Sequence, residues 1–150
     1  MRTRAMLVGG IAVGLFLFLL QGQAQVAIRA ASADPVEGWE RMQFSEGSRS
    51  VWVARTTSLV ATDIERARSY TMPDGRTAVA IVFTESGAKK MRELSAAQLH
   101  KLIAVVVDGK LIWSPLVRSE ISNEASITGN GPNGVPKEIV DRILASVGQK

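Results

Sequence analysis

The sequence contains no cysteine and only one histidine among its 150 residues. The absence of cysteine excludes disulfide bonds, zinc–thiolate sites, thiol nucleophiles and covalent lipoprotein anchoring, because each of these needs a thiol. A single histidine cannot supply a cluster of histidine metal ligands. We therefore expect neither a metal nor another cofactor.

A large excess of positive charge is also lacking. The chain has 18 Lys and Arg against 14 Asp and Glu, a formal net charge of +4. Arg2 and Arg4 belong to a targeting segment, and without them the balance is 16 to 14, or +2. The remaining basic residues alternate with acidic ones instead of forming the basic patch of a nucleic-acid-binding protein. We expect no nucleic-acid partner.

Motifs of known catalytic chemistry are missing as well. The sequence has no G-x-S-x-G and no P-loop pattern. His100 is interpreted as a favourable charge or partial cap at a helix end. A catalytic pair of carboxylates is the enzymatic alternative, although Asp63, Glu65, Asp74 and Asp108 all occupy capping or turn positions. We expect a protein that is not an enzyme.

The features that are present begin with a targeting segment. Two arginines precede the uncharged residues 5–20, and Gly22-Gln23-Ala24 follows with small residues where a signal peptidase reads them. This order predicts a secretory signal peptide over residues 1–24 and an exported protein, periplasmic or extracellular. The alternative is an uncleaved anchor that tethers the chain to the membrane, although about 20 apolar residues are needed for a spanning helix.

The rest of the chain divides into a leader and one domain. Residues 25–35 are rich in Ala and Ser and are predicted to be a flexible leader. With 46% hydrophobic and 21% charged residues over the whole chain, residues 36–150 have the composition of one folded domain. We predict an α+β fold, in which helices cover one face of a mixed, mostly antiparallel sheet.

Three hairpins are predicted from β-forming runs that flank turn residues. They join residues 39–44 to 51–54, residues 68–72 to 77–83 across Pro73-Asp74-Gly75, and residues 102–107 to 110–113 across Asp108-Gly109. The runs 77–83 and 102–107 are apolar throughout, so we expect them to be buried on both faces. Residues 126–128 are a possible last strand.

Helices are predicted from caps and from apolar residues three and four apart. Capping boxes predict short helices after Thr62 and after Ser95, the second with Leu99 inward, and Thr84 is the expected cap of the helix between them. Pro136 is expected to begin the last helix. Its apolar stripe is the clearest in the chain and comprises Ile139, Val140, Ile143, Leu144 and Val147.

Two segments are candidates for binding. The glycine-rich residues 129–134 resemble a phosphate-cradling loop before a helix, but they lack the Lys and hydroxyl of such loops, and a plain linker is favoured. The second candidate is an exposed strand edge that could pair with an extended peptide. It comprises Ile112, Trp113, Pro115, Leu116 and Val117. Ordinary core packing of these five residues is the alternative.

Several of these segments, in this order, resemble the head subdomain of the large periplasmic domain of the SecD protein-export family. The resemblance covers roughly residues 63–129. It is carried by Asp63-Ile64, Gly75-Arg76-Thr77-Ala78-Val79, Thr84-Glu85-Ser86-Gly87-Ala88-Lys89-Lys90-Met91, Val107-Asp108-Gly109-Lys110, Ser114-Pro115 and Ile127-Thr128-Gly129. The sequence departs from the family at Trp113, where a small residue is usual, and in the Gly-Pro loop after Gly129.

The resemblance implies a fold and an extracytoplasmic setting, and it suggests contact with unfolded or exported polypeptide. The family's multi-span membrane portion, which performs the proton-driven work, is not in this sequence. We therefore predict a non-catalytic binding module with a protein or peptide partner. The alternative is a structural or assembly protein of the cell envelope that acts through a fixed interface or as a homodimer.

Overall fold

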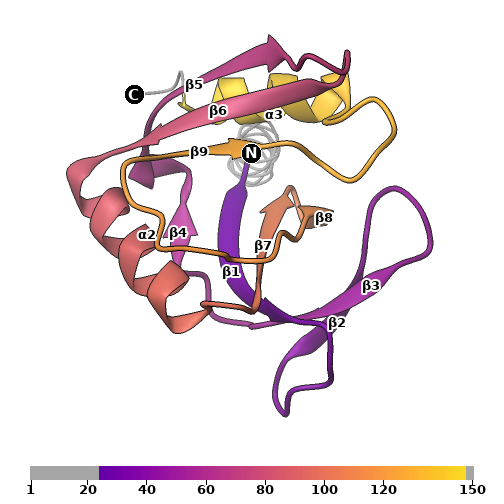
Figure 1. Cartoon of the computed structure of the whole chain (residues 1–150), viewed down its shortest axis with the longest axis vertical. Coiled ribbons are helices and arrows are strands. Elements are labelled where there is room, and N and C mark those ends of the chain that lie inside the picture. The colour runs from indigo at the N-terminus through magenta and orange to yellow at the C-terminus, as the bar shows by residue number, and fades with distance from the viewer. Residues whose placement is uncertain (1–23, 148–150) are drawn as a thin grey trace, which may run out of the picture.

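The structure, a computed structural model, describes residues 24–147 (Figure 1). The predicted signal peptide lies outside these residues except for Ala24. Two antiparallel sheets are accompanied by two α-helices, α2 (Glu85–Ala97) and α3 (Lys137–Val147), and by a short 3-10 helix, η1 (Ala61–Asp63). This confirms the α+β class. Within the described range no helix is long and apolar enough to cross a membrane.

The larger sheet contains six strands and curls on itself. Its order is β2-β3-β1-β7-β8, and β4 also pairs with β1. The strands are β1 (Val26–Ser32), β2 (Glu40–Gln43), β3 (Ser50–Val53), β4 (Leu59–Val60), β7 (Leu102–Val107) and β8 (Lys110–Trp113). Beyond β2, Phe44 forms a bridge with Leu111 of β8, and the Ser45 N–H donates to the Leu111 carbonyl at 2.9 Å. The two edges of the sheet therefore meet.

The smaller sheet consists of β5 (Ile64–Thr71), β6 (Thr77–Phe83) and β9 (Glu124–Ile127), with β6 in the centre. Both of its pairings are antiparallel. In Figure 1 this sheet lies above the larger one, and α3 runs alongside it. The sequence predicted a single sheet, whereas the strands divide between two that share a core.

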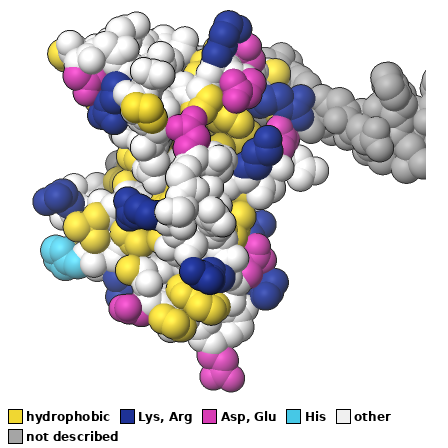
Figure 2. Space-filling model, turned by 90° about the vertical axis from the view of Figure 1, so that its right-hand side faces the viewer, with side chains coloured by type: hydrophobic (Ala, Val, Ile, Leu, Met, Phe, Trp, Pro, Cys, Tyr) yellow, Lys and Arg dark blue, Asp and Glu magenta, His cyan; other side chains and the backbone are white. Residues whose placement is uncertain are grey.

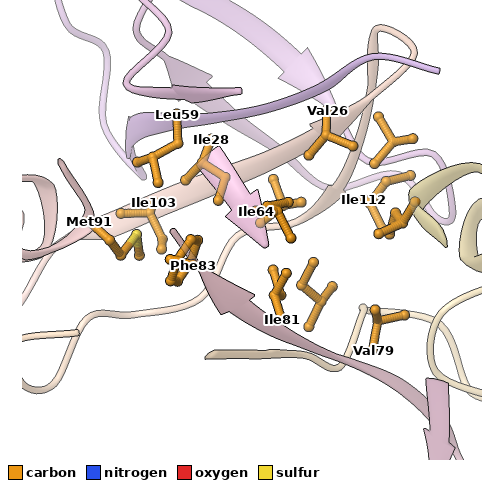
Figure 3. Packing of buried hydrophobic residues seen from close by; sticks show 14 of the residues in the cluster. Val26, Ile28, Leu59, Ile64, Val79, Ile81, Phe83, Met91, Ile103 and Ile112 are labelled. Atoms are coloured by element: carbon orange, nitrogen blue, oxygen red, sulfur yellow. The ribbon is translucent and has the colours of Figure 1, made fainter. Parts of the chain in front are cut away.

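The main core lies between the two sheets and under both α-helices. Figure 3 shows side chains of both sheets and of α2 converging there. Val79, Ile81, Val105 and Ile143 share this interior, as the apolar patterns of their segments predict. A second, smaller cluster fills the inside of the curled sheet and includes Phe44, Val51, Val53, Val106 and Leu111.

The prediction of a flexible leader is wrong for residues 26–32, which form β1. This strand pairs with β7 at six register positions and also with β3 and β4. Val26 and Ile28 point into the main core, and Ala31 points into the second cluster. One face of β1 carries small alanines that pack against the interior of the curled sheet. The alternation of apolar and polar residues along this strand is therefore weak, and the segment resembles a linker in sequence.

The α-helix predicted after Thr62, over residues 63–68, is also wrong, because Asp63 ends η1 and the residues from Ile64 onward belong to β5. This strand pairs with β6 from Ile64↔Phe83 to Thr71↔Thr77, with one irregularity near its start. The capping box of Thr62 and Glu65 does not form; instead, the Asp63 carboxylate accepts the Val60 N–H at 2.9 Å. Pairing along the whole of β6 outweighs the local helix signal.

The second predicted capping box, at Ser95, lies inside α2. The helix runs through Ser95 and ends before His100, whose positive φ of 65° turns the chain. Leu99 is exposed rather than inward. The three predicted hairpins, the Thr84 cap and the buried stripe of the last helix are confirmed.

The two sheets are joined at a junction centred on Asp63, a carboxylate only 4% exposed. Its oxygens accept the Val60 N–H and the Lys90 ammonium, each at 2.9 Å. Its backbone carbonyl accepts the Thr84 N–H, also at 2.9 Å. The junction therefore fixes the start of α2 against the point where the chain passes from the larger sheet to the smaller.

The approach of α2 to this junction requires a glycine at position 87. A Cβ added to Gly87 would lie 2.2 Å from the Asp63 carbonyl oxygen, closer than any side chain tolerates. We predict that Gly87→Ala lowers the free energy of unfolding by roughly 2–3 kcal/mol, since backbone must shift to accept the methyl group. Urea denaturation measures the difference. Ser86→Ala, at the neighbouring exposed helix position, is the control and should change stability little.

A second junction ties the turn at Asp108 to both ends of the described chain. The Arg142 Nε of α3 donates to one carboxylate oxygen of Asp108 at 2.7 Å, and the Gln25 N–H donates to the other at 2.9 Å. The hydrogen bond from Arg142, followed by that from Gln25, lowers the pKa of Asp108 below its ordinary value. The ionised carboxylate is therefore favoured in the folded state.

We predict a pH signature for this junction. Because folding lowers the pKa of Asp108, the stability that it contributes is fully present above roughly pH 4, the usual aspartate pKa. It is lost as the pH falls through the lowered folded-state pKa. Asp108→Asn should be less stable than the parent at neutral pH, and the difference should shrink in acid. Thermal unfolding across the pH range tests this; a deficit that is the same at all pH values contradicts it, and Asp34→Asn, an exposed site, is the control.

Candidate functional site

An apolar groove opens between the smaller sheet and the segment that follows β8. Its volume is about 330 Å³, at the small end of the range for ligand sites. Seventeen residues line it: Ile28, Ile81, Phe83, Met91, Ile103, Val105, Trp113, Pro115, Leu116, Val117, Arg118, Ser119, Ile121, Glu124, Ala125, Ser126 and Ile127.

The floor of the groove is the edge of the main core. Ile28 comes from β1, Ile81 and Phe83 from β6, and Met91 from α2, and each of these side chains is buried. Figure 3 shows Phe83 and Met91 side by side, with Ile81 farther along the same strand as Phe83. A ligand in the groove would therefore contact aliphatic and aromatic carbon at its base.

One wall is the chain between β8 and β9, which is tethered at two points. At the first, the Val117 N–H donates to the Lys101 carbonyl at 2.8 Å, and the His100 N–H donates to the Val117 carbonyl at 2.8 Å. At the second, the buried hydroxyl of Ser95 accepts the Ile121 N–H at 2.8 Å. Residues 118–120 between the tethers are exposed.

The same end of α2 is held by a buried glutamine. The Gln98 amide nitrogen donates to the carbonyls of Ala31 at 3.1 Å and Leu102 at 2.9 Å. The sequence predicted that Ser95 and Gln98 form a capping box at the start of a new helix. Instead, Ser95 lies within α2 and Gln98 directly follows it, and both side chains anchor this end of the helix to neighbouring segments. They fix the wall of the groove to the larger sheet.

The other wall is β9, the edge strand of the smaller sheet. Ala125 and Ile127 face the core on this strand, and Ile127 is buried. Glu124 from this wall and Arg118 from the opposite wall place one charge of each sign among the lining residues. Arg118 lies close in sequence to the exposed ion pair of Arg92 and Glu120, at 3.5 Å.

Four of the five predicted edge residues line the groove, and one does not. Trp113, Pro115, Leu116 and Val117 are lining residues, whereas Ile112 lies in the main core. Leu116 is 48% exposed, whereas Val117 is 2% exposed and belongs to both the core and the groove. The backbone of Pro115 and Val117 is occupied by bonds to Ile103 and Lys101.

The sequence offered no signal for the remaining lining residues. Ile28 lay in the expected leader, and Phe83 and Met91 were expected only as core. Residues 126–128 were predicted as a possible last strand, and nothing local shows that the strand, which the structure places at Glu124–Ile127, is an edge. Their meeting depends on the placement of one sheet over the other, which local patterns do not encode.

The glycine-rich loop and His100, also considered from the sequence, both have structural roles. In the glycine-rich loop the Asn133 carbonyl accepts the Thr77 N–H, and the Val135 N–H donates to the Thr77 carbonyl, both at 2.9 Å. A Cβ at Gly134, whose φ is 86°, would lie 2.1 Å from the Thr77 carbonyl oxygen. These contacts are those of a linker fitted against β6. His100 is exposed and turns the chain at the end of α2.

Charged side chains of both signs are spread over the surface. On the face shown in Figure 2, Lys and Arg alternate with Asp and Glu, and hydrophobic side chains appear in small separate groups. Among residues 24–147, no three His, Cys, Asp or Glu side chains lie together as metal ligands would.

The fold matches that of solved SecDF structures. A solved structure described as "a membrane component SecDF that enhances protein export" superposes with a TM-score of 0.61 at 21% identity, covering 87% of this chain and 64% of that chain. A second, SecDF in a super-membrane-facing form, gives 0.62 at 22% identity over 86% of this chain and 20% of that one. At such identities, these likenesses show the fold.

The sequence comparisons give the family. The sequence model described as "SecDF, P1 head subdomain" matches residues 39–135. The chain therefore belongs to the SecDF P1 head subdomain family, as the resemblance in its motifs implied. The match begins after β1 and ends before α3, so these two elements lie outside it.

Two curated relatives agree with this assignment. The protein translocase subunit SecD of Acidaminococcus fermentans is 33% identical over 75 residues, which are 49% of this chain and 18% of that protein. The protein translocase subunit SecDF of Thermus thermophilus is 32% identical over 69 residues, 46% of this chain and 9% of that protein. The chain thus spans less than a fifth of the length of either relative.

Proposed function

We propose that this domain binds unfolded polypeptide outside the cytoplasm, and that the groove beside β9 is the binding site. The observation that carries the proposal is the apolar floor of the groove, open to solvent between an edge strand and a tethered segment. Unfolded chains expose the aliphatic and aromatic side chains that such a floor removes from water. The two charges on its walls add polar contacts at the rim.

The family supports the same proposal. Its members are parts of protein-export factors, and one solved relative is described as enhancing protein export. An export factor meets polypeptides before they fold, so a site for side chains of many sequences suits it better than a site for one ligand. In this role the domain needs no catalytic residue: it holds a chain and releases it.

Leu116 is the residue whose substitution tests the site most directly, because it lines the groove yet is 48% exposed. We predict that Leu116→Asp weakens the binding of a reduced, carboxymethylated secretory protein at least tenfold, since a charge replaces apolar contact area. Titration calorimetry gives the affinity, and the melting temperature shows that the fold is kept. Trp113 is a poorer choice because it also packs against the core.

Leu99 supplies the matched control. It is 41% exposed and does not line the groove, so Leu99→Asp makes the same chemical change elsewhere. The control variant should bind as the parent does. Equal loss of affinity in both variants, or no loss in either, contradicts the assignment of the groove as the polypeptide site.

A further inference from the structure

Strand β9 has one side paired and one side open, and its register shows which backbone groups are open. The Phe83 N–H donates to the Asn123 carbonyl at 2.9 Å, and the pairs that follow are Val82↔Glu124, Ile81↔Ala125 and Ala80↔Ser126. In an antiparallel ladder, hydrogen-bonded pairs alternate with pairs that make no bond to each other. The backbone groups of Ala125 therefore face β6.

The N–H and C=O groups of Glu124 and Ser126 consequently point away from β6. Both residues line the groove, although their side chains lie on the outer face of the sheet with Ala80 and Val82. No residue of the described range 24–147 forms a backbone hydrogen bond to these outward groups. Two donors and two acceptors at strand spacing thus border an apolar floor.

This combination specifies the shape of the occupant. Donors and acceptors that repeat every second residue along an edge are matched by another extended main chain. In a chain paired there, every second side chain lies on the same face as Ala125 and Ile127, toward the core. That face is the floor made by Ile81, Phe83 and Met91.

We propose that polypeptide binds in the groove as an added strand of the smaller sheet, hydrogen-bonded to the backbone of Glu124 and Ser126. This inference rests on the proposed function and adds the binding mode and the preferred substrate. The preferred segment is extended and carries apolar side chains at alternate positions. Hydrogen bonds to the main chain of the polypeptide do not depend on its side chains, so many sequences can bind. The apolar floor favours segments whose apolar side chains alternate with polar ones.

The probe for the test is a ten-residue peptide of alternating valine and threonine with lysine at each end. Two matched peptides carry N-methyl groups on the valine nitrogens or on the threonine nitrogens, which removes donors from one edge of the strand and leaves the side chains unchanged. One methylated peptide should bind at least tenfold more weakly than the parent peptide, and the other should bind nearly as well. Equal affinities of the two methylated peptides overturn the strand-addition mode.

A pair of protein variants tests the same bond from the other side. Ser126→Pro removes the outward N–H and no bond of the β6–β9 ladder, a position where proline is tolerated in edge strands. Its binding should fall at least tenfold. Ser126→Ala keeps the N–H and loses only the side-chain bond with the Tyr70 hydroxyl, at 3.1 Å, so its affinity should stay within about twofold. Equal affinities of the two variants overturn the proposal.

Hydrogen exchange on the unmodified protein gives a readout that does not depend on the folding of a variant. The amides of Glu124 and Ser126 should exchange at least tenfold more slowly with saturating peptide. If the peptide binds and Leu116→Asp weakens it, but these two amides are unchanged, the groove remains the site and the strand-addition mode is wrong. If no peptide or unfolded protein binds, both proposals fail. Protection that rises with protein concentration alone identifies a second copy as the occupant and also overturns this mode.

Discussion

The structure depends on the junction at Asp63, where the chain leaves the larger sheet and enters the smaller. The two sheets share a core, and Asp63 lies where they join. Its buried carboxylate holds the turn at Val60 and the Lys90 side chain, and its backbone carbonyl holds the start of α2. Removing one partner of such a group leaves buried charge or buried hydrogen-bonding groups without compensation. The junction therefore fixes α2, which contributes Met91 to the groove, against the point where the two sheets meet.

The residues that carried the family resemblance have mainly structural roles. Thr84 caps α2, Gly87 allows the helix to approach the Asp63 carbonyl, and Lys90 pairs with the Asp63 carboxylate. Asp108 forms a turn with positive φ and binds Arg142. These contacts explain how motifs far apart in the sequence identify the fold. They also explain why the motifs say little about the ligand, since the groove is lined mostly by other residues.

The hairpins, the burial of β7 and the last helix were predictable because each has a strong local cause, whereas β6, expected to be buried on both faces, has Ala80 and Val82 on a partly exposed outer face. Turn residues set the hairpins, and an apolar stripe sets the helix. The strand at Val26 to Ser32 was not predictable in this way, since alanines that fit the curled interior resemble a linker. Residues 63–68 carried a helix signal that only the long pairing with β6 could override.

For the candidate site, local patterns located one wall but not the whole. The apolar segment from Trp113 to Val117 was singled out, and four of the five chosen residues line the groove. The opposite wall, β9, is short and has no distinctive composition. One side of β9 is unpaired because β9 is the last strand in the order of the smaller sheet. The sequence of residues 124–127 alone therefore could not reveal this unpaired side.

The position of β1 has a consequence for how the chain acquires its structure. This first strand has its partners in β3, β4 and β7, and the last of these ends at Val107. A ribosome makes the chain from its N-terminus, so one side of this strand can pair early with β3 and β4, whereas the other side must wait until β7 has been made. Pairing across so many residues slows folding, so the larger sheet is completed only after more than half of the domain has been synthesised.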